Sequence, residues 1–187
     1  EDVRPFVNVA GLLTDAGLAA PAILAQDPEA GFLLLEDLGD SIYTRVLAQG
    51  EDEQKLYLPA IDALVALHKT GKHDGLPVYD DDLLLFEVSL LTDWFMPLAG
   101  LELTDQGRED YLNLWRELLP LAREMPDCVV LRDYHADNLL WLPDRKGIAR
   151  VGQLDFQDAV TGPTTYDLVS LLEDARRDVA PDTVAAA

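Results

Sequence analysis

Cysteine is almost absent from this chain, because Cys128 is the only one among its 187 residues. A single cysteine cannot form a disulfide within the chain, so nothing indicates an oxidising compartment. Histidine is scarce as well, with three residues, and these are not spaced with the cysteine as zinc ligands are. The sequence therefore predicts neither a disulfide scaffold nor a zinc site.

Basic residues are also few: 14 Lys and Arg stand against 35 Asp and Glu, for a formal net charge of -21. This charge repels polyanions, and the basic residues form no stripe that would suit a nucleic acid. Nucleic acid is therefore not an expected partner. An anionic nucleotide would have to be held by metal ions, backbone N–H groups and a few well-placed cations.

Long apolar runs are missing too. No window approaches the roughly 20 uninterrupted apolar residues that span a membrane, and the acidic first residues do not begin a signal peptide. Hydrophobic residues still make up 49% of the chain, which is enough for a sizeable core in what the length predicts to be about one domain. We expect a cytoplasmic globular chain without a membrane partner, and nothing in the sequence indicates an oligomeric state.

The central feature is a polar turn, Arg-Asp-Tyr-His-Ala-Asp-Asn, that lies between apolar runs. Such runs predict strands at residues 129–131, 139–142 and 148–154. The turn contains Asp133 and Asn138, and the last run is followed directly by Asp155. If the strands pair, these three residues meet at one edge.

Oxygen-bearing side chains at this spacing suit phosphoryl transfer from ATP. That reaction depends on positioning and on metal ions that neutralise the phosphate oxygens, and Mg²⁺ prefers oxygen ligands. Protein kinases use a catalytic aspartate, an asparagine five residues later and a downstream Asp-Phe-Gly motif. Asp133, Asn138 and Asp155 keep this order. Leu131 and Gln157 replace the histidine and the glycine of protein kinases, so the pattern is not a protein kinase signature.

Residues 131–140 and 154–172 together resemble the aminoglycoside phosphotransferase family. Within that family the sequence of these two segments is most similar to that of the sugar kinases of cell-wall recycling. Those enzymes phosphorylate the anomeric hydroxyl of N-acetylmuramate and N-acetylglucosamine with ATP. The resemblance implies an α+β, protein-kinase-like bilobal fold. It places the last helix and the β-hairpin of the N-terminal lobe in residues 1–36 and a mostly helical C-terminal lobe in residues 37–187.

The resemblance also implies roles for individual residues. Asp133 is the catalytic base of the family pattern. Asn138 and Asp155 correspond to the residues that hold Mg²⁺. His135 and Asp158 line the site beside them.

Two further roles follow from the resemblance. Asp167 supports the loop from behind, although a carboxylate in the first turn of a helix also suits a simple capping role. The backbone of Glu36, Asp37 and Leu38, at the end of an apolar run, corresponds to the segment between the lobes that binds adenine. A strand that ends in such residues is common, so this second role rests mainly on the family.

Apolar periodicity predicts helices around this centre. The expected helical spans are 3–16, 41–49, 53–69, 83–99, 104–123 and one that begins at Thr164 or Thr165. Two short apolar runs at 21–25 and 31–35 predict a hairpin. Trp94 and Trp115 stand at helical spacing and are expected in a core rather than against a sugar.

A phosphate-binding loop and a nucleotide-binding lysine are not recognisable. No two glycines stand two residues apart, and the lysines fall on predicted helices or loops: Lys55, Lys69, Lys72 and Lys146. Only Glu1 is available as the glutamate that would pair with such a lysine. We therefore expect a fragment of a longer kinase, truncated at both ends, and the missing parts argue against activity of this polypeptide alone.

Two functions remain as hypotheses. The first is an ATP-dependent phosphotransferase whose favoured acceptor is an amino sugar, with aminoglycoside, choline and homoserine acceptors left open because an acidic chain also suits polycations. The second is a catalytically silent kinase-like fragment or pseudokinase that binds a partner or a metal. The presence of Asp133, Asn138 and Asp155 together favours catalysis in the complete protein.

Overall fold

Helices and short antiparallel strands share the computed structural model, which describes residues 2–187. In chain order the elements are α1 (Arg4–Asp15), β1 (Ile23–Asp27), β2 (Phe32–Leu35), α2 (Tyr43–Ala48), α3 (Glu53–Lys69), α4 (Asp81–Leu90), α5 (Met96–Leu98), α6 (Asp105–Ala122), β3 (Asp127–Val130), β4 (Leu139–Trp141), β5 (Val151–Gln153), β6 (Val160–Pro163), α7 (Tyr166–Leu172) and α8 (Pro181–Ala186). This mixture confirms the α+β class expected from the sequence. Glu1, the glutamate considered for a lysine partner, lies outside the described residues.

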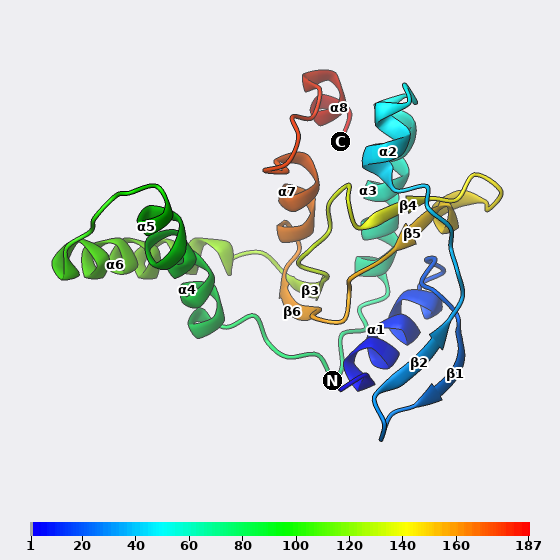
Figure 1. The fold of residues 1–187 in the computed structure, drawn as a ribbon, viewed down its shortest axis with the longest axis horizontal. Coiled ribbons are helices and arrows are strands. Elements are labelled where there is room, and N and C mark those ends of the chain that lie inside the picture. The colour runs from blue at the N-terminus through cyan, green and yellow to red at the C-terminus, as the bar shows by residue number, and fades with distance from the viewer. Residues whose placement is uncertain (1) are drawn as a thin grey trace.

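Within the described residues, the strands form antiparallel pairs rather than one continuous sheet. β1 pairs with β2 as the expected hairpin, β3 with β6, and β4 with β5. The strands on either side of the polar loop therefore do not pair with each other. Cys128 lies opposite Gly162 in one pair, and Leu139 lies opposite Gln153 in the other. The polar loop passes from the first pair to the second (Figure 1).

A buried core lies between α1, α3, α7 and these strands. α3 begins after Asp52, whose side chain accepts a hydrogen bond from the Lys55 amide at 2.9 Å, and it buries one apolar face. Large side chains of this core include Leu13, Tyr43, Leu56, Tyr57, Leu67, Tyr134, Phe156 and Leu171. The Tyr134 hydroxyl donates to the Ala60 carbonyl of α3 at 2.8 Å. The polar loop is thereby attached to the central helix.

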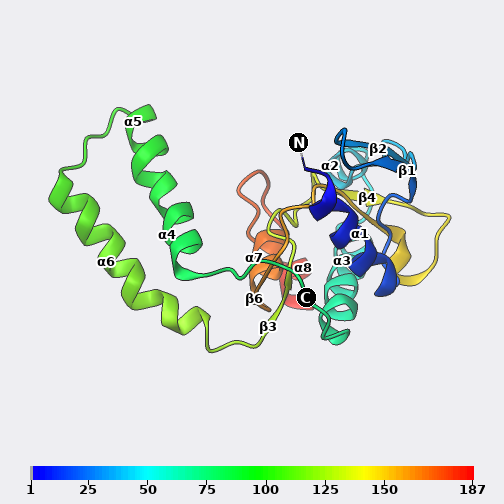
Figure 2. The same cartoon turned by 90° about the horizontal axis from the view of Figure 1, so that it is seen from below.

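The segment from α4 to α6 projects from the rest of the molecule as an arm (Figures 1 and 2). A single helix was expected over 83–99, but α4 ends at Leu90 and a π-helical stretch, Leu91–Phe95, leads into α5. Pro97 has no amide hydrogen for the carbonyl four residues earlier, and the wider turn precedes it. Although α6 has 18 residues, no helix among the described residues combines the length and apolar character that a membrane crossing requires.

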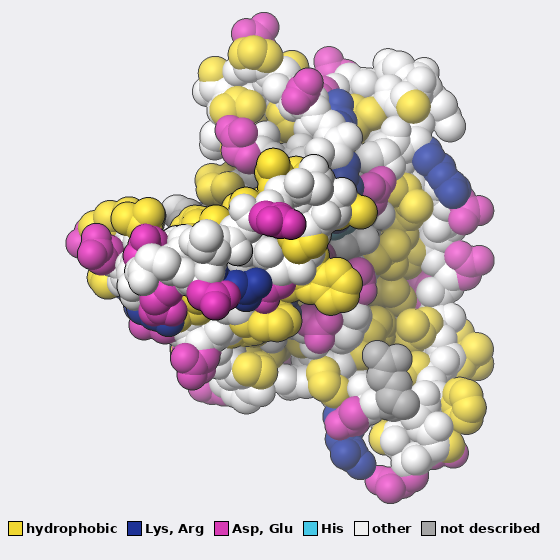
Figure 3. Space-filling view, turned by 60° about the vertical axis from the view of Figure 1, so that its left-hand side comes forward, with side chains coloured by type: hydrophobic (Ala, Val, Ile, Leu, Met, Phe, Trp, Pro, Cys, Tyr) yellow, Lys and Arg dark blue, Asp and Glu magenta, His cyan; other side chains and the backbone are white. Residues whose placement is uncertain are grey.

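The arm also corrects the expectation that Trp94 lies in a core, because its side chain is 73% exposed. A pair of helices cannot cover every face of each other, so apolar side chains remain on the arm's surface among acidic and basic ones (Figure 3). Trp115 is half-buried and packs edge-on against Tyr111, with ring centroids 6.3 Å apart.

Gly152 in β5 generates a stability prediction. A Cβ atom there would lie 2.9 Å from Leu140 Cβ and 3.2 Å from Leu142 Cδ1, so Gly152→Ala should overpack the β4–β5 pair and lower the unfolding free energy by about 1–3 kcal/mol. Gly11 is the matched control, because a Cβ on this α1 residue meets nothing within 4 Å. Gly11→Ala should raise stability by about 0.5–1 kcal/mol in the same urea titrations. Equal effects of the two substitutions would contradict this account of the strand pair.

Candidate active site

A buried carboxylate holds the start of the polar loop. Asp167 lies in the first turn of α7 and is 1% exposed. Its Oδ2 accepts a hydrogen bond from the Leu131 amide at 2.7 Å, and its Oδ1 accepts one from the Arg132 amide at 3.0 Å. β3 ends at Val130, so these two amides lie beyond the β3–β6 ladder and need a partner of another kind. Both oxygens of Asp167 are thus used by the loop.

Burial raises the pKa of the Asp167 carboxyl to about 7, against the lowering effect of the Leu131 and Arg132 amides. The negative charge of Asp133 adds to the rise. The carboxyl group therefore lies in an environment where its charge is disfavoured, although its geometry serves the loop.

The backbone is strained on both sides of the site. Among the described residues, Arg132 with φ 69° and Asp155 with φ 55° are the only residues other than glycine with positive φ. Such conformations cost an L residue about 1–3 kcal/mol and persist only where surrounding contacts enforce them, often at functional sites. Arg132 directly precedes Asp133, and Asp155 is itself one of the residues that the sequence pattern indicates.

Asp133, Asn138 and Asp155 lie at one end of the β4–β5 pair, which is called the junction below. Asn138 directly precedes β4, and Asp155 is the second residue after β5, so antiparallel pairing brings both to the same end of the β4–β5 pair. The Asn138 side-chain amide donates to the Asp133 carbonyl at 3.0 Å. The Asn138 backbone carbonyl accepts from the amide of Leu154, the neighbour of Asp155, at 3.0 Å. The Asp133 side chain is exposed beside them.

The residues at this junction fit a magnesium ion. Since the side-chain nitrogen of Asn138 donates to Asp133, its Oδ1 remains as an acceptor for a cation. Asp155 adds a carboxylate, of which Oδ1 accepts from the Gln157 side chain at 2.7 Å. Among residues 2–187, no group of three His, Cys, Asp or Glu side chains is arranged to hold a metal. Mg²⁺ typically takes one or two protein ligands and completes its shell with waters and phosphate oxygens, so this pair suits an ion that arrives with a nucleotide.

His135 is buried next to the junction. It is 7% exposed, and its Nε2 lies 3.4 Å from the side-chain nitrogen of Asn138. Its Nδ1 has no hydrogen-bond partner among the described residues. His135 therefore has one ring nitrogen with unused hydrogen-bonding capacity.

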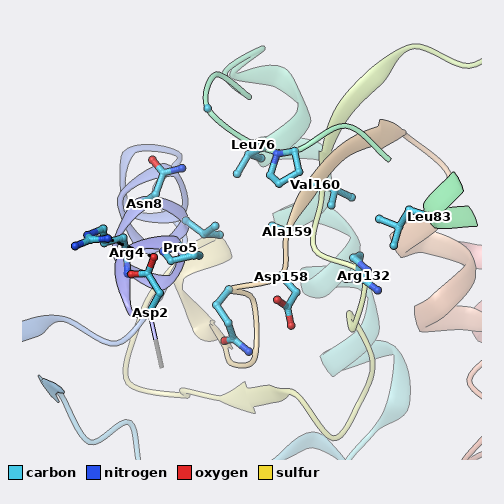
Figure 4. A pocket seen from close by; sticks show the side chains of 14 residues that line it. Asp2, Arg4, Pro5, Asn8, Leu76, Leu83, Arg132, Asp158, Ala159 and Val160 are labelled. Atoms are coloured by element: carbon cyan, nitrogen blue, oxygen red, sulfur yellow. Dashed lines mark hydrogen bonds and ion pairs between the residues drawn. The ribbon is translucent and has the colours of Figure 1, made fainter. Parts of the chain in front are cut away.

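Asp158 lines a different pocket, of about 500 Å³, between the start of α1 and the residues before β6. Figure 4 shows Asp158 and Arg132 on one side of this pocket and Arg4 and Asn8 of α1 on the other. Asp133 is not among the residues that line it. Arg132, the neighbour of Asp133, and Gln157, whose side chain donates to Asp155, line the same pocket, so Asp158 lies in a space next to the junction.

Asp133 lies between two shallow depressions that both include Arg132 and Tyr166. One, of about 270 Å³, faces α4 and is completed by Phe86, Glu87 and Leu90. The other, of about 240 Å³, faces α7 and is completed by His135, Ser170, Glu173, Asp174, Ala175 and Arg176. A small molecule that occupied either depression would contact the residue expected to act as base.

The residues expected to bind adenine follow β2. The Glu36 amide already donates to the Ala22 carbonyl at 2.8 Å, and the Glu36 side chain pairs with Arg145 at 2.7 Å. Leu38 packs against the same small cluster as Leu154, the residue before Asp155. The segment therefore lies next to the strand end that carries Asp155.

Sequence reasoning missed the surroundings of Arg132. Its guanidinium pairs with Glu87 of α4, 45 residues earlier in the chain. Glu87 is the only charged residue between Leu83 and Leu91. An isolated charge within an apolar helical run is a signal that could have marked it, but the sequence does not reveal the partner.

The family model described as "Phosphotransferase enzyme family" matches residues 1–187. An N-acetylmuramate/N-acetylglucosamine kinase of Caulobacter vibrioides is 43% identical over 195 residues, which cover 98% of this chain and 53% of that protein. A protein of the same name from Pseudomonas aeruginosa is 44% identical over 94% of this chain and 50% of its own length. The chain thus spans about half the length of the curated relatives it matches.

The solved structures agree on the fold. The crystal structure of an ADP-bound aminoglycoside phosphotransferase matches with a TM-score of 0.66, covering 97% of this chain and 63% of that chain. The sequence identity is 18%, so this likeness bears on the fold alone. It confirms the kinase-like fold that the resemblance to the aminoglycoside phosphotransferases implied.

The buried carboxyl of Asp167 generates a pH prediction. Its folded-state pKa lies above the ordinary value of 3.8, so the folded protein binds this proton more tightly than the unfolded chain does. The stabilisation that results is complete below about pH 4 and is lost as the pH rises through about 7. The asparagine of Asp167→Asn cannot titrate. Its side-chain oxygen can accept a hydrogen bond from one loop amide, but its NH₂ group cannot accept the other.

We expect Asp167→Asn to have a lower unfolding free energy than the wild type at pH 4. This difference, the margin between the two proteins, should shrink by up to a few kcal/mol as the pH rises to 8. Urea unfolding of both proteins across this range measures the margin and cancels the titration of the other carboxylates. A margin that stays constant or widens with pH would contradict the assignment.

Proposed function

Since this chain belongs to the phosphotransferase enzyme family, we propose that it carries the catalytic lobe of an ATP-dependent kinase that phosphorylates the anomeric hydroxyl of an amino sugar. The convergence of Asp133, Asn138 and Asp155 at one end of the β4–β5 pair is the observation that carries the proposal. The names of the relatives that are 43% and 44% identical favour N-acetylmuramate and N-acetylglucosamine as acceptors. Residues 1–36 then belong to the N-terminal lobe and residues 37–187 to the C-terminal lobe.

In this proposal Asp133 is the general base. Its exposed carboxylate accepts the proton of the acceptor hydroxyl while the oxygen attacks the γ-phosphorus of ATP. A new oxygen–phosphorus bond forms, the bond to the bridging β–γ oxygen breaks, and ADP leaves with that oxygen. Because the Asp133 carbonyl also accepts from Asn138, the base and the proposed metal ligand are held in one arrangement.

Asn138 and Asp155 would hold Mg²⁺, and the backbone of Glu36, Asp37 and Leu38 would bind adenine. The ion, when bound, neutralises the charge on the phosphate oxygens. A chain with a net charge of -21 needs such a cation to hold a polyanionic nucleotide.

A hydroxyl-rich acceptor suits the depression on the α7 side of Asp133. Two buried polar atoms of its lining residues, His135 Nδ1 and Asp174 Oδ2, have no partner among the described residues. Buried polar atoms without partners are costly, and the hydroxyl and amide groups of an amino sugar can both donate and accept hydrogen bonds. His135 and Asp174 are therefore proposed to contact the acceptor, and Asp158 is proposed to line the neighbouring pocket.

The test is phosphorylation by the full-length protein with Mg-ATP and N-acetylmuramate, N-acetylglucosamine or kanamycin. Asp133→Asn should lower kcat by about 10²- to 10⁴-fold with little change in nucleotide affinity, because it removes the proton acceptor and leaves the metal ligands in place. Asp137→Asn is the matched control in the same loop, since that side chain accepts from Thr44 at the surface. Sugar turnover that survives Asp133→Asn would exclude the proposed base, and turnover of kanamycin alone would exclude the amino-sugar acceptor. An absence of turnover with every acceptor would favour a silent kinase-like domain.

A second variant tests the metal site. Asp155→Asn removes the only carboxylate among the proposed ligands and should raise the Mg²⁺ concentration required for half-maximal turnover by at least about tenfold. Kinetic titration with Mg²⁺ at fixed ATP measures the shift. The control is Asp144→Asn, in the exposed turn after β4. Its turnover should depend on the Mg²⁺ concentration as that of the wild type does. An unchanged Mg²⁺ requirement in Asp155→Asn would place the ion elsewhere.

A further inference from the structure

Glu87 of α4 is the centre of a partly buried polar cluster next to the polar loop. Its Oε1 pairs with the Arg132 guanidinium, and its Oε2 accepts from the Tyr79 hydroxyl. The Tyr166 hydroxyl donates to the same Oε2 at 3.4 Å. The Arg132 and Glu87 side chains are only 26% and 21% exposed. One carboxylate thus joins the arm, the polar loop and α7.

Arg132 is restrained at each end of its backbone and along its side chain. Its amide donates to Asp167 at 3.0 Å, and its carbonyl accepts from the Ser170 hydroxyl at 3.5 Å. Its guanidinium lies 5.9 Å from the centre of the Tyr79 ring as well as pairing with Glu87. These contacts hold a residue with a φ of 69°, whose carbonyl is joined directly to the nitrogen of Asp133.

The protonation states of Arg132 and of the two phenols suit their contacts with Glu87. Burial would lower the pKa of Arg132, but the hydrogen bond and the charge of Glu87 outweigh it and raise the pKa. Burial raises the pKa of the Tyr79 hydroxyl, and Glu87 raises it further. Burial raises the pKa of Tyr166 as well. Both phenols therefore remain hydrogen-bond donors to Glu87 at neutral pH.

The same helix borders Asp133 from another side. Phe86 and Leu90, together with Glu87, line the depression on the α4 side of Asp133. α4 is thus both a wall of the space next to the base and the source of the carboxylate that holds Arg132. A displacement of the arm would change both at once.

We infer that Glu87 is a positioning residue, which couples the α4–α6 arm to the alignment of Asp133 through the Glu87–Arg132 pair. The inference rests on the proposed function, since it concerns the same base. The Glu87–Arg132 pair then sets how far Phe86 and Leu90 of α4 stand from Asp133 on the α4 side of the base. The arm acts on the chemistry through this contact.

The experiment compares Glu87→Gln with Asp81→Asn in the full-length protein. Glu87→Gln keeps the size and an acceptor oxygen but removes the charge that holds Arg132, so kcat should fall at least about tenfold while the KM for ATP changes less than about twofold. Asp81→Asn removes the exposed pair between Asp81 of the same helix and Arg123, the residue that follows α6. Its kcat should match that of the wild type, because exposed pairs contribute little.

A double-mutant cycle separates a coupled pair from two independent losses. Arg132→Lys should lower kcat to a similar extent, and the double variant should be no worse than either single variant. Additive losses would overturn the inference. A Glu87→Gln enzyme with wild-type kcat would overturn it too, while leaving the proposed function intact.

Amide hydrogen exchange provides a readout that does not depend on turnover. Faster exchange at Leu131, Arg132 and Asp133 in Glu87→Gln, but not in Asp81→Asn, supports the coupling even if the wild type phosphorylates none of the acceptors. A wild type that phosphorylates none of the acceptors would contradict the proposed function but not the coupling. Equal exchange in the two variants would overturn the coupling whatever the activity.

Discussion

The two amides that follow β3 have a single buried carboxylate as their partner, and the arrangement of the site depends on this interaction. Asp167 accepts from Leu131 and Arg132, which lie 36 and 35 residues earlier in the chain. The contact joins the first turn of α7 to the end of β3 and turns the chain away from the β3–β6 ladder. Arg132 adopts a left-handed conformation at this point, and Asp133 follows it into solvent. The charge of Asp167 is disfavoured by burial, so the protein retains a costly group at the point where the loop needs two acceptors.

From there the loop enters the core and returns to the surface. Tyr134 and Ala136 are buried, and the Tyr134 hydroxyl reaches the Ala60 carbonyl of α3. Asp133 and Asp137 are exposed on either side of this buried stretch. The apolar residues of the loop thus anchor it, and the acidic ones remain available. This separation explains how a short segment without regular structure can hold the proposed base and the proposed metal ligand at fixed positions.

Local patterns in the sequence predicted much of the fold. The helix expected over 53–69 has those bounds in the structure, and the hairpin and the strand–loop–strand order are present, because burial periodicity and turn residues act over a few positions. Strand partners could not be predicted in the same way, since the residues of β3 pair with residues of β6 that lie thirty or more positions away. Trp94 was misplaced because periodicity shows which residues share a helix face, not whether anything covers that face. The Glu87–Arg132 pair could not be predicted for a similar reason, because it joins helix and loop through the tertiary fold.

The most direct test of the central claim is a crystal structure of the full-length protein with Mn²⁺, a non-hydrolysable ATP analogue and N-acetylglucosamine. The anomalous signal of Mn²⁺ identifies the metal, which prefers the same oxygen ligands as Mg²⁺. The account predicts the ion between Asn138 Oδ1 and the Asp155 carboxylate, with the anomeric hydroxyl within hydrogen-bond distance of Asp133. A metal bound without these two residues, or a sugar whose anomeric hydroxyl points away from Asp133, would contradict it.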